Sequence, residues 1–124
     1  MSQDHQHQMS SLRSPKMWRY QVIATLLDQE SVDHYLDWLL RGHVAAVCAW
    51  ADHAEVVQLQ GSDLQKRSTQ VMSVYWFASR EEFDRYEREG APLLRAEGIE
   101  LADQLGGITF ERTLGWSQRV EGQG

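Results

Sequence analysis

The strand-like segment 68–78 most constrains the fold of this chain, because it carries large apolar side chains on both of its faces. Its alternation places Val71, Tyr75 and Phe77 on one face and Met72, Val74 and Trp76 on the other. The segment 17–27 alternates in the same way and presents on one face Trp18, Tyr20, Val22, Ala24 and Leu26. Strands that are apolar on both faces need cover on both, so we expect these two in the centre of a sheet.

Two helical segments separate the strand-like segments. The first, capped by Asp28 or Ser31, ends at Gly42 or continues to Val47. At 100° per residue its apolar stripe contains Val32, Leu36, Leu39 and His43, flanked by Tyr35 and Leu40. The second opens with a capping box, Ser79 to Glu82. Because Pro92 cannot lie in a helix interior, we expect a break near Gly90 and a second piece that either ends at Gly98 or is extended by a further turn over 99–105.

The order of these segments predicts the fold class. Strands are expected over 17–27, 50–60, 68–78 and 108–116, which gives β-α-β-β-α-β, the split βαβ or ferredoxin-like arrangement. Right-handed crossovers place the first and third strands in the centre of a four-stranded antiparallel sheet and both helices on one of its faces. This arrangement is an α+β fold. The bare face would be a large apolar patch, so we expect a homodimer packed sheet to sheet.

Length and charge bound the domain organisation and the partners. Most of the 124 residues fit one domain at 17–116. We expect a disordered tail at 1–16 before it and a short tail at 117–124 after it. Either Met1 or Met17 is the initiator. The net charge of -6 argues against nucleic acid as a partner. No segment is apolar enough for a membrane span or a signal peptide, so we expect a cytoplasmic protein.

Several short motifs resemble one known family. Trp38 and His43 form a Trp-x-x-x-x-His element, and after Tyr86 follows Ala91-Pro92-Leu93-Leu94-Arg95. Over 17–116 the chain resembles a family of small bacterial proteins of unknown function in the dimeric α/β-barrel superfamily. The resemblance implies the same fold, but the superfamily includes cofactor-free monooxygenases, isomerases, haem enzymes and pure ligand-binding modules.

The candidate site residues surround the space between sheet and helices. His43 is either a general base or a core histidine hydrogen-bonded to a carbonyl, and the structural role is favoured because no second catalytic group has a readable spacing to it. The residues expected to wall a ligand site are Tyr20, Trp38, Tyr75 and Phe110. No metal site is predicted, since His53 and Glu55 lack identifiable partner ligands.

Two functions remain open, and the sequence does not decide whether the protein is an enzyme. The first is a non-catalytic dimeric module that binds a small apolar or aromatic molecule or another protein. The alternative is a cofactor-independent monooxygenase-like or isomerase-like enzyme for a small apolar or aromatic substrate, with His43 as proton carrier. The sequence lacks a phosphate loop, a nucleophile elbow and a metal triad, which favours the first, and no cofactor is predicted.

Overall fold

The computed structural model describes residues 16–61 and 68–122. Apart from Lys16, the tail predicted at 1–16 lies outside the described residues, as do residues 62–67 between the predicted strands 50–60 and 68–78. The elements follow in the order β1 (Met17–Thr25), α2 (Gln29–Trp38), η1 (Leu39–His43), α3 (Val44–Val47), β2 (His53–Gln58), β3 (Gln70–Phe77), α4 (Arg80–Glu89), α5 (Ala91–Gln104) and β4 (Thr109–Ser117).

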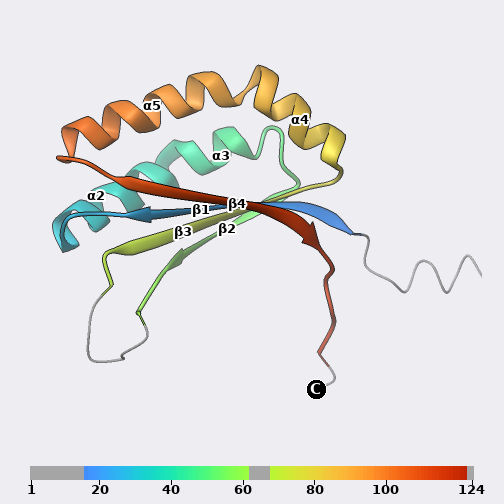
Figure 1. The fold of residues 1–124 in the computed structure, drawn as a ribbon, viewed down its shortest axis with the longest axis horizontal. Helices are drawn as coiled ribbons and strands as arrows, with labels where there is room; N and C mark the ends of the chain where they lie inside the picture. Colours follow the sequence, from blue (N-terminus) through green and yellow to red (C-terminus); the bar gives the residue numbers. More distant parts are fainter. Residues whose placement is uncertain (1–15, 62–67, 123–124) are drawn as a thin grey trace, which may run out of the picture.

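The four strands form one antiparallel sheet in the order β2-β3-β1-β4. The prediction that the first and third strands are central is therefore confirmed. All helices lie over one face of the sheet (Figure 1). There α4 contacts β1 and β3, and α5 contacts α3. This arrangement confirms the predicted α+β, ferredoxin-like fold.

The register of the central strands explains where the core lies. Tyr20 pairs with Tyr75, and Val22 pairs with Ser73, on the face that the helices cover. Val71 and Phe77 on the same face of β3 are completely buried. The alternation read from the sequence therefore assigned the helix-covered face of both central strands correctly.

The first helical segment differs from the regular helix that its periodicity predicts. Asp28 caps α2 as expected, since its carboxylate accepts a hydrogen bond of 2.8 Å from the Ser31 amide. The helix then widens into the π-turn η1, in which the Val44 amide donates to the Leu39 carbonyl five residues back. Leu40, which the periodicity places beside the apolar stripe, is 69% exposed.

The second helical segment breaks where the sequence predicts. Ser79 caps α4 by accepting a 3.1 Å hydrogen bond from the Glu82 amide, and α5 begins directly after Gly90. A Cβ atom at Gly90 would lie 2.5 Å from Nε1 of Trp50, so only glycine allows this close approach. The second piece does not end at Gly98. It continues to Gln104, in agreement with the alternative of a further turn over 99–105.

Strand boundaries also shift. β2 is shorter than the predicted strand at 50–60, since it begins only at His53 and ends at Gln58. Trp50 lies before the strand and packs against Gly90. β4 extends by one residue into the predicted C-terminal tail, where the Ser117 hydroxyl accepts a 3.2 Å hydrogen bond from Nε1 of Trp76.

Candidate functional site

A cavity of about 240 Å³ lies between the helix-covered face of the sheet and the helices. All five predicted site residues line it, namely Tyr20, Trp38, His43, Tyr75 and Phe110. They come from β1, α2, η1, β3 and β4, so the fold brings together side chains that are up to 90 residues apart in sequence. This placement makes the cavity the candidate site, while the role of each residue stays a prediction.

The π-turn determines how His43 faces the cavity. In a regular α-helix residues five positions apart lie about 140° apart around the axis, whereas a π-turn brings them close together. Here the rings of Trp38 and His43 stack with a centroid separation of 4.1 Å and an angle of 20° between planes. Both rings also border an outer groove between η1 and α5. The stacked pair therefore forms a wall between this groove and the inner cavity.

His43 is neutral at physiological pH. Burial lowers the pKa of its imidazole to about 4, because the charged form is poorly solvated there. Its Nδ1 atom is buried and has no hydrogen-bond partner. The favoured expectation, a core histidine satisfied by a backbone carbonyl, is therefore wrong for this nitrogen.

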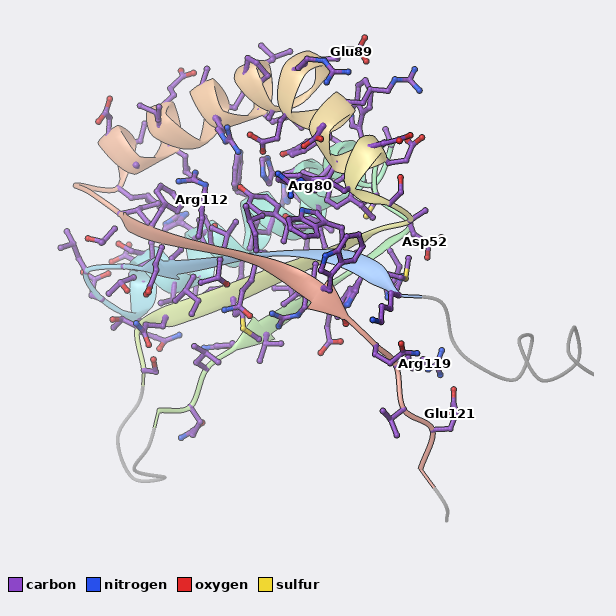
Figure 2. The ribbon with its side chains drawn as sticks, turned by 45° about the vertical axis from the view of Figure 1, so that its right-hand side comes forward. Asp52, Arg80, Glu89, Arg112, Arg119 and Glu121 are labelled. Atoms are coloured by element: carbon purple, nitrogen blue, oxygen red, sulfur yellow. The ribbon has the colours of Figure 1, made fainter. Side chains whose placement is uncertain are left out.

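A polar chain connects α4, α5, β1 and β4 along the cavity. Nη2 of Arg95 donates to Glu87 and, at 3.5 Å, to the hydroxyl oxygen of Tyr20. Nε of Arg112 donates to the same oxygen at 3.0 Å. In Figure 2 Arg112 lies on the helix side of β4, beneath α5. Two guanidinium groups thus converge on one phenol at the cavity wall.

Arg95 keeps its positive charge although it is partly buried. Removal from water lowers the pKa of its guanidinium, but the hydrogen bonds with Glu87 and Tyr20 outweigh this effect and raise the pKa above its ordinary value. Arg112 lies over the ring of Phe110, with 5.4 Å between the guanidinium carbon and the ring centroid. Within 16–61 and 68–122, Arg112 forms no ion pair with a carboxylate.

Buried polar atoms without partners concentrate at this cavity. In the part of the chain that the structure describes, four buried side-chain nitrogen or oxygen atoms have no hydrogen-bond partner. Three of them belong to cavity residues, His43 Nδ1, Ser73 Oγ and Arg95 Nε, and the fourth is Trp18 Nε1. Native proteins satisfy nearly all such atoms, so a cluster of three needs an explanation.

The hydroxyls of Tyr35, Tyr75 and Tyr86 remain protonated. Burial raises the pKa of Tyr35 to about 12, and it also raises the pKa values of Tyr75 and Tyr86. Hydrogen bonding to the nearby Ser73 hydroxyl opposes this rise at Tyr35 and Tyr75, although Ser73 Oγ makes no hydrogen bond of normal geometry within the described residues. The cavity therefore offers hydrogen-bond donors as well as apolar ring surface.

Sequence reasoning missed several residues of the site, chiefly Tyr35, Ser73, Arg95 and Arg112. Tyr35 was expected only to flank the apolar stripe. Arg95 stands in the Ala-Pro-x-Leu-Arg motif, and Arg112 interrupts the apolar face of the last strand. A charged residue on an otherwise apolar face was the available signal for Arg112, but nothing local indicated that it meets Tyr20.

The remaining polar residues do not extend the site. His53 and Glu55 lie on the uncovered face of β2, where His53 contacts Asp52 at 2.8 Å and stacks on Trp76. Among the described residues no group of three or more His, Cys, Asp or Glu side chains could hold a metal ion. In the same ranges no helix has the length and apolar character to cross a membrane.

Comparison with solved structures finds the same fold. The chain is similar to two dimeric ferredoxin-like proteins, each from an uncultured marine organism. The first matches with a TM-score of 0.60 and 11% identity over 84% of this chain and 96% of the other. The second matches with a TM-score of 0.56 and 10% identity over 86% of this chain and 94% of the other. No family model and no curated protein matches the chain.

Proposed function

We propose that the protein is a non-catalytic, homodimeric module that binds one small molecule in the cavity between its sheet and its helices. A cavity of about 240 Å³ is larger than the roughly 150 Å³ engineered cavity that accepts benzene, so it suits a molecule with one ring and a short substituent. Its aromatic walls supply apolar contact, as in most small-molecule sites.

The cluster of unpartnered buried atoms carries this proposal. Leaving one buried polar group without a partner costs about 1–3 kcal/mol. Three such atoms surround this cavity, namely His43 Nδ1, Ser73 Oγ and Arg95 Nε. Together they lower the stability of the free protein, which is hard to explain for a fold that binds nothing there. A polar ligand would satisfy them, which explains why the chain keeps them.

The alternative function, proton transfer by His43 in a monooxygenase-like or isomerase-like reaction, has less support. General base catalysis works best when the pKa of the base is near the operating pH. With a pKa near 4, the His43 imidazole is too weak a base to remove a proton from a carbon acid efficiently at neutral pH. Its neutral ring is better suited to accept or donate a hydrogen bond to a bound molecule.

The proposed binding site can be tested with a set of single-ring probes, benzoate, benzamide, benzyl alcohol and phenol, by saturation-transfer NMR. Gly98 lines the cavity, and a Cβ atom there would meet only Trp38, at 3.7 Å. The Cβ atom of Gly98→Leu should therefore fit, and the rest of its side chain should fill part of the cavity and weaken binding. Ala96→Leu, at an exposed position on the same helix, is the control. If no probe binds, or if Gly98→Leu leaves binding unchanged, the proposal fails.

The homodimer is proposed on the uncovered face of the sheet. Both solved structures named above are described as dimeric. On this face half-buried apolar side chains, Ile23, Val57, Met72 and Trp76, surround the almost completely buried Val74. A second copy would cover them. Sedimentation equilibrium should show a dimer at micromolar concentration that Met72→Glu dissociates, whereas a wild-type monomer would contradict the dimer.

A further inference from the structure

We propose that the ligand of this cavity is a small monoanion, a carboxylate carried on a single apolar or aromatic ring, and that Arg112, Arg95 and Tyr20 bind its carboxylate group. This inference rests on the proposed binding function and names the class of ligand. It is carried by the charge, the hydrogen-bond directions and the size of the site.

The first argument is the charge around the cavity. The chain as a whole has a net charge of -6, yet no acidic side chain of the described residues lines the cavity. Two guanidinium groups line it, and Glu87 neutralises only Arg95. His43 adds no charge, because the pKa of its ring lies near 4. One positive charge, that of Arg112, therefore remains for a ligand with one negative charge.

The second argument is the direction of the hydrogen bonds at Tyr20. Its hydroxyl oxygen accepts from Nε of Arg112 and from Nη2 of Arg95, so both of its lone pairs are used. The hydroxyl hydrogen is free to donate, and within the described ranges no acceptor receives it. A phenol held in this way is a directed donor, and it needs an acceptor oxygen from the ligand.

The third argument is the donor capacity of the arginines. Each guanidinium has five N–H donors in a planar fork that matches a carboxylate. Arg112 uses its Nε on Tyr20, and its remaining donors have no carboxylate partner in the described part of the chain. Arg95 Nε is buried with no partner at all. A carboxylate placed beside Tyr20 can accept from both arginines and from the phenol.

The fourth argument is the body of the ligand. Besides the arginines, the cavity wall includes the stacked Trp38–His43 pair, Tyr35 and Phe110. Tyr35 lies 5.8 Å from Trp38 and 6.4 Å from Phe110 between ring centroids. These faces offer apolar and stacking contact to one ring, and the volume leaves no room for a large second substituent.

The test compares two probes of equal size, benzoate and benzamide, which differ in charge. We expect benzoate to bind the full-length protein at least tenfold more tightly than benzamide in calorimetric titrations at pH 7. Arg112→Gln should weaken benzoate about tenfold and leave benzamide unchanged. Arg88→Gln removes the same charge from an exposed site on α4 and should change neither affinity. Tyr20→Phe keeps the ring but loses the donor, and should weaken benzoate several-fold.

Failure of this inference can be distinguished from failure of the proposed function. If both probes bind equally, and Gly98→Leu abolishes both, the cavity binds small molecules but does not select anions. If Arg88→Gln weakens benzoate as much as Arg112→Gln does, only the overall charge attracts it, and the assignment of Arg112 is wrong. If neither probe binds and the broader probe set also fails, both the inference and the proposed function are overturned.

Discussion

Replacing His43 by leucine should stabilise the free protein, although the ring is stacked and more than half-buried. Removing a buried nitrogen that has no partner recovers about 1–3 kcal/mol. Losing the stacked contact with Trp38 costs about 0.5–1.5 kcal/mol. The balance is a stabilisation of about 1 kcal/mol, which corresponds to a rise in melting temperature of about 4 °C for a domain of this size.

The measurement is urea and thermal unfolding followed by circular dichroism in the absence of added ligand. His34→Leu is the matched control, since His34 lies on the same helical segment but its side chain is 63% exposed. The control should change the free energy of unfolding by less than about 0.5 kcal/mol. A loss of more than about 1 kcal/mol in His43→Leu, with a neutral control, would refute the reasoning, because it would mean that the ring is held by a hydrogen bond.

Three further predictions follow from single contacts. Burial lowers the pKa of His43 from 6.5 to about 4. Between these two pH values His43 is protonated in the unfolded chain but not in the folded chain. The free energy of unfolding should therefore fall as the pH is lowered from about 6.5 to about 4. Unfolding curves across this range should show a smaller fall for His43→Leu than for the wild type. Gly90→Ala should cost about 1–3 kcal/mol, because its Cβ would lie 2.5 Å from Trp50, whereas Gly42→Ala, which meets nothing within 4 Å, should be neutral or stabilising in the same denaturation assay. Asp28→Ala removes the cap of α2 and should lower the free energy of unfolding, and an unchanged urea midpoint would contradict this role.

The fold was accessible from the sequence because its determinants are local. Alternation identified the central strands, and the side-chain caps Asp28 and Ser79 marked where α2 and α4 begin. The break near Gly90 followed from Pro92, since proline can occupy only the first turn of the helix that follows. Each of these signals lies within about ten residues and needs no knowledge of tertiary contacts.

The polar half of the site was not accessible in this way. Arg95 and Arg112 meet at Tyr20, 75 and 92 residues away in sequence, and only the sheet register and the path of α5 bring them together. The π-turn was missed for a related reason. A uniform 100° step cannot represent one wide turn, and no residue type in Leu39–His43 marks it. The predicted aromatic residues, in contrast, were found because each lies on a face that alternation or periodicity had already assigned.

The strand β4 lies at an edge of the sheet, with consequences for local stability. It pairs only with β1, and two of the side chains it presents toward the helices, Leu114 and Trp116, are 53% and 60% exposed. Since little apolar burial holds β4, its amides should exchange faster than those of the central strands β1 and β3 in native-state hydrogen exchange. The hydrogen bond from Arg112 to Tyr20 connects the middle of β4 to the buried side of β1. A molecule bound by both Arg112 and Arg95 would connect β4 to α5. Binding of a ligand in the cavity should therefore slow the amide exchange of β4.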